Sequence, residues 1–232
     1  MVRKWSLLLA AFALAACDGG SGSSKCTSGC TTENNGGEMI HGSGTVKTET
    51  RPVETFTAVR LSSSANVVIE RTGTESLTVS GDDNLVSLFI SEVRDGTLYL
   101  SFAKGKSFEG KTPTYRITMK DMRTLTVSGS GDIEASKIEG DALSVSVSGS
   151  GDIRLAGQVG ELTVAVAGSG GVEATKLNAK RARITVSGSG NAAVNVSDEL
   201  DAKISGSGDI SYLGSPKVTK NVSGSGTIKP KS

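Results

Sequence analysis

Three aspartates recur at one position of a repeated sequence unit, and they are the chain's main candidates for chemistry. Asp132, Asp152 and Asp209 each follow a Ser-Gly-Ser-Gly segment, and the equivalent positions of the other units hold Gly171, Asn191 and Thr227. If the units stack about 4.8 Å apart, carboxylates on neighbouring units are close enough to bridge Ca²⁺, which prefers several oxygen ligands. Asp and Asn also favour tight turns, because their side chains hydrogen-bond to nearby backbone. Gly171 and Thr227 interrupt a metal ladder, so we favour the turn role and assign no metal and no cofactor.

Stacked acids are also the raw material of glycoside cleavage, which needs two carboxylates about 5 to 10 Å apart. Asp132 and Asp152 meet that separation by stacking alone. The single Trp is Trp5 and the single histidine is His41, however, and both lie near the N-terminus. A Ser-His or Cys-His nucleophile therefore has no candidate in the folded region, and aromatic surfaces for sugar stacking are scarce. We expect no catalytic residues.

The charge balance excludes one class of partner. The chain carries 25 Lys and Arg residues against 24 Asp and Glu residues, so it is close to neutral. A surface that binds nucleic acid needs an excess of positive charge to meet the phosphates. We therefore expect no nucleic-acid partner.

The aspartates belong to a repeat that begins at Leu125. The first Gly of each Ser-Gly-Ser-Gly segment or close variant lies at 129, 149, 168, 188, 206 and 224, which gives steps of 20, 19, 20, 18 and 18 residues. Apolar residues alternate with polar ones before each segment, which places them on one face of a strand. A unit of this length cannot bury its apolar face alone and must stack on its neighbours. Examples of the alternating residues are Leu143, Val145 and Val147, then Leu162, Val164 and Val166.

The repeat predicts an all-β fold, a right-handed parallel β-helix-like solenoid with rungs of 18–20 residues and Gly-Ser-Gly corners. Right-handed coiling is the default for parallel crossovers. A left-handed coil of three hexapeptides is the rival, but no six-residue subperiod is visible. We expect glycine at the corners for two reasons: a tight bend needs positive φ, and adjacent rungs bring backbone close to backbone. The last rung must also blunt its open strand edge, and Lys217, Lys220 and Pro230 are suited to that.

Residues 45–124 contain weaker relatives of the same unit. The segment 41–46 resembles the last corner, 223–228, and 63–67 is typical of a degenerate corner. The turn 94–97 predicts a hairpin between two strands. We expect this half to be an irregular cap on the first regular rung, with the regular repeats occupying 125–232. Strands are expected at 67–70, 77–80, 85–93, 98–102 and 115–119.

The first 44 residues predict export and anchoring. Residues 1–16 have a basic start and an apolar run too short to span a bilayer, which is the layout of a signal peptide. Leu14 to Cys17 resembles a bacterial lipobox, so we expect a lipoprotein signal with Cys17 lipidated; ordinary cleavage with an incidental Cys17 is the alternative. Residues 17–44 read as a Gly/Ser-rich tether. Within it Cys26 and Cys30 form a small disulfide or stay as thiols, or else bind a metal with His41.

Five segments of apolar and turn residues follow one another in a set order along the chain: Phe56–Leu61, Ala65–Glu70, Leu77–Asn84, Asp95–Leu100 and Leu125–Ile133. Together they resemble a known family, the head GIN domain of auto-transporter adhesins. The resemblance covers roughly residues 53 to 215 and implies a β-helix-like fold similar to that of pectin lyases without their catalytic residues, together with a role in cell adhesion. It brings no functional residues, and the ligand-binding residues stay unknown. This chain is shorter than a large adhesin.

These observations predict a lipid-anchored protein of the bacterial cell envelope, on the periplasmic side of the inner membrane or at the outer membrane. Its non-catalytic solenoid would act in binding, adhesion or envelope structure, with a protein or glycan ligand. Asp18 after the lipid-bearing Cys17 resembles an inner-membrane retention signal. The alternatives are a polysaccharide-active enzyme of pectin-lyase-like fold and a Ca²⁺-dependent scaffold.

Overall fold

Alternating apolar residues build the chain into β-strands that coil in parallel, as the computed structural model shows for residues 38–231. The chain divides into two units, 1–35 and 36–232, and only the second is described here. The predicted signal peptide, Cys17, Cys26 and Cys30 lie outside the described residues. Among residues 38–231, no helix has the length and apolarity needed to cross a membrane.

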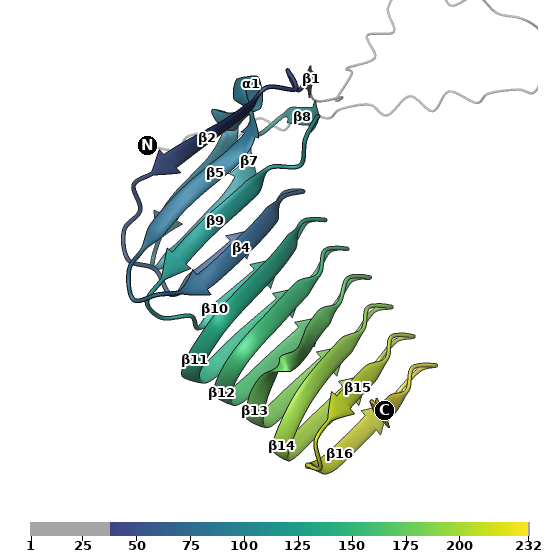
Figure 1. The fold of residues 1–232 in the computed structure, drawn as a ribbon. Coiled ribbons are helices and arrows are strands. Elements are labelled where there is room, and N and C mark those ends of the chain that lie inside the picture. The colour runs from purple at the N-terminus through teal and green to yellow at the C-terminus, as the bar shows by residue number, and fades with distance from the viewer. Residues whose placement is uncertain (1–37, 232) are drawn as a thin grey trace, which may run out of the picture. The chain divides into compact units, whose positions relative to one another are not determined.

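The regular coils each contribute one strand segment before a Ser-Gly-Ser-Gly corner and one after it (Figure 1). We call the two resulting layers the pre-corner face and the post-corner face. Strands β11 to β14 run through both faces, because the chain bends at the end opposite the corner without breaking its strand pairing. The strands are β10 (Thr124–Val127), β11 (Asp132–Val147), β12 (Ile153–Val166), β13 (Val172–Val186), β14 (Ala192–Ile204), β15 (Ile210–Leu213), β16 (Lys217–Val222) and β17 (Ile228–Pro230).

The strand register confirms the predicted repeat. On the post-corner face Ile133 pairs with Ile153, and the same ladder continues through 172, 192, 210 and 228, which reproduces the steps of 20, 19, 20, 18 and 18 residues. The register shifts lie toward the bend, for example between Ala135 and Ile138. Lys137 lies there with a φ of 55°. Differences in rung length are therefore absorbed at the bend, and the corners stay aligned.

The corner glycines are required mainly for the second of the two predicted reasons. A Cβ added to Gly151 would lie 1.9 Å from the carbonyl oxygen of Gly131, and one added to Gly170 would lie 2.0 Å from that of Gly151. Of the repeat-corner glycines only Gly224 has a positive φ, of 146°. The expectation that the bend itself needs positive φ was wrong for the others. Close stacking of backbone on backbone excludes a side chain there.

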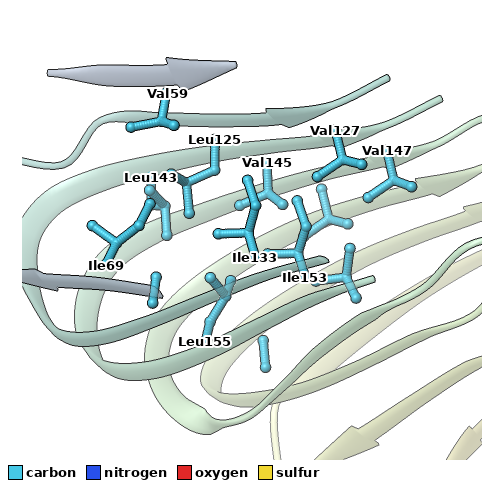
Figure 2. Close-up of a cluster of buried hydrophobic side chains, with 14 of the residues drawn as sticks. Val59, Ile69, Leu125, Val127, Ile133, Leu143, Val145, Val147, Ile153 and Leu155 are labelled. Carbon is cyan, nitrogen blue, oxygen red and sulfur yellow. The ribbon is translucent and has the colours of Figure 1, made fainter. Parts of the chain in front are cut away.

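The core is a set of aliphatic ladders between the two faces. Val59, Leu125 and Val145 stack on the pre-corner face, and Ile133 and Ile153 stack on the post-corner face (Figure 2). All of them are buried. Burying such a side chain contributes about 1.5–3 kcal/mol, so each added coil extends the core by several favourable contacts.

The N-terminal strands form the predicted cap, but their order in the stack differs from their order in the chain. β3 (Ala58–Leu61) and β4 (Asn66–Arg71) form the coil that pairs with β10 and β11. The chain then runs outward through β5 (Ser76–Asp82), α1 (Asp83–Val86) and β6 (Phe89–Arg94). It returns through β7 (Thr97–Phe102) and β9 (Thr114–Met119), which lie on the outer side of β3 and β4. The first coil in the chain is thus inserted between later ones.

Most of the expected cap features are present. Ser63 and Ala65 face Gly129 and Gly131 across the stack, so 63–67 is a true corner. The turn 94–97 closes the antiparallel hairpin of β6 and β7, with positive φ at Asp95 and Gly96. The strand expected at 85–93 was wrong at its start, because Leu85 and Val86 belong to the short helix α1 and fill the core from there.

Residues at the end of the expected tether form a strand, in a separate two-stranded sheet beside the solenoid. Strand β1 (Glu38–His41) pairs in parallel with β8 (Lys106–Glu109), and Ile40 lies opposite Phe108. Ile40 packs against the core, which gives this segment apolar area to bury. The Asn84 side chain then donates a hydrogen bond of 2.8 Å to the carbonyl of His41. The following strand, β2 (Val46–Arg51), pairs with β5 at the outer edge of the cap.

A charged side chain lies at an inward-facing strand position at each end of the core. On the outermost strand β2, Arg51 lies opposite the buried Leu77, and its guanidinium donates to the carbonyl oxygens of Val86 (2.7 Å) and Phe89. On β16, the last strand of the pre-corner face, the exposed Lys220 lies opposite the buried Ala202, and its Nζ donates to the carbonyl oxygen of Ile228 at 2.9 Å. Inward-facing charge discourages further strands from adding to an edge.

Candidate ligand-binding site

The repeated aspartates and asparagine form a ladder of hydrogen bonds between coils. The Oδ1 of Asp132 accepts the backbone N–H of Asp152 at 2.9 Å, and the Oδ1 of Asp152 accepts that of Gly171 at 2.7 Å. Asn191 and Asp209 accept the N–H groups of Asp209 and Thr227 at 2.9 and 2.8 Å. Each side chain therefore binds the equivalent residue of the next coil. This is a turn-stabilising role as predicted, but it acts between coils and not within one turn.

Asp209 is a ladder member whose charged form is favoured by its hydrogen bonds. Asp209 accepts both the hydroxyl and the N–H of Thr227, and these bonds hold the pKa of its carboxyl below the usual range. Arg154 lies beside two other members, with its guanidinium nitrogens 3.9 Å from Asp132 Oδ2 and 3.7 Å from Asp152 Oδ2. These carboxylates therefore have structural partners already. No group of three or more His, Cys, Asp or Glu side chains able to hold a metal occurs within 38–231.

The ladder is interrupted once in the middle of the stack, at Gly171. Because glycine has no side chain, the backbone N–H of Asn191 lacks the side-chain acceptor that its counterparts on other coils have. The gap opens as a surface hollow of about 440 Å³ on the post-corner face. Its lining includes Gly171, Ala193, Asp152 and Asn191. We call this feature the Gly171 hollow.

Charged residues of both signs line the Gly171 hollow. Arg154, Glu173 and Lys231 all belong to its lining, and Lys231 Nζ lies 3.3 Å from Glu173 Oε1. Partial burial alone would raise the pKa of Glu173, but hydrogen bonds from Thr175 and Lys231 outweigh it and hold that pKa below the usual range. The hollow thus offers ionised acceptors and cationic donors side by side.

The sequence analysis found part of this site. Asp132, Asp152, Gly171 and Asn191 are brought together as their equivalent positions required. It missed the charged lining, Arg154, Glu173 and Lys231. Arg154 and Glu173 are paired across the sheet, so the same spacing used for the aspartates could have found them. Lys231 arrives from the chain's end, 58 residues after Glu173, and no repeat spacing indicates it.

The remaining predicted residue, His41, is far from this hollow in the fold. It belongs to β1 at the N-terminal cap, and its Nδ1 lies 3.2 Å from Glu109 Oε2 in an exposed pair. A metal site with Cys26 and Cys30 stays an untested alternative, since both cysteines fall in the part of the chain that is not described.

The fold defines the class of protein: a parallel β-solenoid of about five turns whose coils carry polar ladders on the outside. The sequence profile of one family, described as "putative auto-transporter adhesin, head GIN domain", matches residues 55–216. The chain belongs to this family. The resemblance expected for 53 to 215 is thereby confirmed.

Solved structures support the same assignment. A crystal structure titled a putative adhesin from Bacteroides fragilis is 26% identical, with a TM-score of 0.69, and the match covers 83% of this chain and 100% of that one. A protein titled a putative lipid binding protein, from Parabacteroides distasonis, is 25% identical with a TM-score of 0.53, over 84% and 100% of the two chains. A second P. distasonis protein, titled a putative adhesin, shares the fold at 20% identity and a TM-score of 0.55, over 84% and 100%. A search of curated proteins found no match.

Proposed function

We propose that this protein is a lipid-anchored adhesin of the bacterial cell envelope, whose solenoid binds a surface ligand and catalyses no reaction. The observation that carries the proposal is the family match over residues 55–216, together with a relative titled an adhesin that aligns over its full length. The stacked aspartates, which are the candidates for the alternative catalytic role, also support this proposal. The Oδ1 atoms of Asp132 and Asp152 accept backbone N–H groups, and Arg154 lies beside both residues.

The anchor is proposed to be an acylated Cys17, followed by the tether. Acyl chains hold a protein at a membrane because each buried methylene contributes about 0.8 kcal/mol. Replacing Cys17 with Ser should therefore move the protein from the membrane fraction to the soluble fraction. Cys26→Ser is the matched control, because that cysteine lies in the tether and should not change the fractionation. Membrane retention of the Cys17→Ser variant would overturn the lipid anchor.

Adhesion itself is tested with the complete protein in lipid vesicles. Vesicles that carry the lipidated chain should be retained on a subset of immobilised glycans and proteins, whereas empty vesicles of the same composition should not. Equal retention of both on every surface would contradict the adhesive role. Proteolysis of intact cells then separates the two envelope locations, since a surface-exposed solenoid is cut and a periplasmic one is protected.

A further inference from the structure

We propose that the Gly171 hollow is a binding site for a neutral glycan, which it holds through the glycan's hydroxyl groups. This inference rests on the proposed binding function and gives it a site and a class of ligand. The hollow lies on the post-corner face in the middle of the regular coils, at the junction of β12, β13 and β14. Its volume of about 440 Å³ falls within the range of small-molecule sites.

The backbone at the hollow is prepared for a ligand oxygen. On the neighbouring coils the equivalent N–H groups, those of Asp152 and Gly171, each donate to a side-chain oxygen of the preceding coil. At Asn191 the donor is present and the side-chain oxygen is missing, because residue 171 is glycine. A ligand oxygen placed in the hollow would take over that acceptor position and continue the ladder.

The charges around the hollow favour a ligand without net charge. The lining pairs two carboxylates, Asp152 and Glu173, with two cations, Arg154 and Lys231. An anion would gain from the cations but would be repelled by the carboxylates, and the reverse holds for a cation. A hydroxyl group can donate to a carboxylate and accept from an N–H or a cation, so one neutral molecule with several hydroxyls satisfies both kinds of group.

The small residues of the lining also favour a neutral glycan. Gly171 has no side chain and Ala193 has a small one, and both belong to the lining, so a flat ring can approach the strand backbone closely. Serines 169 and 211 add hydroxyls at the edge. With no aromatic side chain in the lining, binding depends on hydrogen bonds, and we expect a Kd on the order of 1 mM for one short oligosaccharide. Repeated weak contacts between many anchored copies and a polymeric glycan would then add up.

The matched variant for this site is Gly171→Asn, which supplies the missing ladder side chain and takes the acceptor position in the hollow. A Cβ at Gly171 lies 3.3 Å from both Asn191 O and Asp152 Oδ1, so it needs only a small local adjustment, and no positive φ opposes it. We expect this variant to melt at the same temperature as the unchanged protein or higher. Thr227→Asn is the control, because it places the same side chain on the ladder in the last coil, away from the hollow.

The test follows backbone amide resonances of the full chain in detergent micelles during titration with chitotetraose, mannotetraose and cellotetraose. At least one neutral tetrasaccharide should shift the amides of Gly171, Asn191 and Ala193. The affinity should fall at least tenfold in Gly171→Asn and stay unchanged in Thr227→Asn. Tetragalacturonate, an acidic tetrasaccharide, should bind more weakly than the neutral ones.

Three results would overturn the proposal: no shift of these amides with any neutral probe, equal binding by Gly171→Asn, or preference for tetragalacturonate at the hollow. The vesicle experiment keeps this outcome separate from the proposed adhesion. If vesicles carrying Gly171→Asn still adhere as the unchanged chain does, adhesion stands and its site lies elsewhere. If vesicles with the unchanged chain never adhere while the amides of the hollow respond to a glycan, the site stands and adhesion fails.

Discussion

Both ends of the solenoid must close an open strand edge, and they do so with different amounts of structure. At the N-terminal end the antiparallel strands β5 and β6 fold over the stack, and Arg51 is held with 15% of its side chain exposed. At the C-terminal end β16 and β17 add one more parallel coil, and the cation is the exposed Lys220. The N-terminal end is thus closed by a cap of additional strands, whereas the C-terminal end is a parallel coil like the interior ones.

Both ends nonetheless use a cation that reaches from one face to a backbone carbonyl of the other. Arg51 bonds to two carbonyls and to the hydroxyl of Ser91, whereas Lys220 bonds to one carbonyl and lies over the ring of Tyr212 at 5.6 Å. The cation at the cap therefore makes more contacts than the one at the C-terminal coil. We expect the stack to loosen first from its C-terminal coil, because that coil has a neighbour on one side only and lacks the additional antiparallel strands of the cap.

The largest effect should come from forcing a side chain into a corner. Gly151→Ala places a Cβ 1.9 Å from Gly131 O between two fixed coils, and we expect a loss of about 3 kcal/mol in the free energy of unfolding. Gly226→Ala creates the same contact, 2.0 Å from Gly208 O, but the last coil is free to shift, so about 1 kcal/mol is expected. Urea denaturation measures both.

Gly140→Ala is the control for these corner variants. No atom lies within 4 Å of its added Cβ, so the change should stay within about 0.5 kcal/mol. If Gly226→Ala costs as much as Gly151→Ala, the C-terminal coil is as rigid as the interior and the comparison of the ends fails.

The next largest effect should separate the two end cations. Arg51→Met leaves the carbonyls of Val86 and Phe89 without their charged donor in a half-buried setting, so we expect a loss of about 2 to 3 kcal/mol. Lys220→Met removes one exposed bond and should cost less than about 1 kcal/mol. Thermal melts followed by circular dichroism compare the two variants.

Sedimentation tests whether Lys220 also protects the C-terminal edge against association. Lys220→Met should associate more as concentration rises, because it removes charge from an open edge. A variant that stays monomeric at high concentration would show that something other than Lys220 protects this end.

The smallest effect should appear as a pH dependence confined to the last coil. The pKa of Asp209 is lowered in the folded state by its bonds from Thr227, so the stability it contributes is present above the unfolded pKa, near 4, and is lost as pH falls through the lower folded value. Hydrogen exchange at the Thr227 amide, corrected for its intrinsic rate, should lose protection below about pH 4. Asp209→Asn keeps an acceptor without titrating and should abolish that pH dependence. If the variant shows the same pH profile as the unchanged protein, the assignment of the dependence to Asp209 is wrong.

The regular coils could be predicted from the sequence because one local constraint sets them. A corner glycine has no room for a Cβ against the backbone of the preceding coil, so the spacing from Gly129 to Gly224 reports the length of each rung directly. The cap could not be predicted in the same way. The insertion of β3 and β4 between later strands depends on which partners are still free in three dimensions, and nothing in their local pattern specifies it.

The residues of the candidate site also fall into those that the repeat spacing predicts and those that it does not. The gap at Gly171 is readable as a missing member of a repeated position, and the equivalence of Asp152 and Asn191 follows from spacing. Lys231 reaches Glu173 only because three further strands of the post-corner face, β14, β15 and β17, bring the chain's end back to it. Long-range placement of a single tail residue leaves no period in the sequence to detect.

The bend, where rungs of 18, 19 and 20 residues differ, makes the molecule extensible. Corners stay in register while register shifts near Ala135 and Ala156 absorb an extra residue or two. A complete coil inserted between two corners would leave both closing cations, Arg51 and Lys220, with their present neighbours. It would also carry the C-terminal end about 4.8 Å further from the cap. The length of such a protein can therefore change by whole coils while the structures of both ends stay the same.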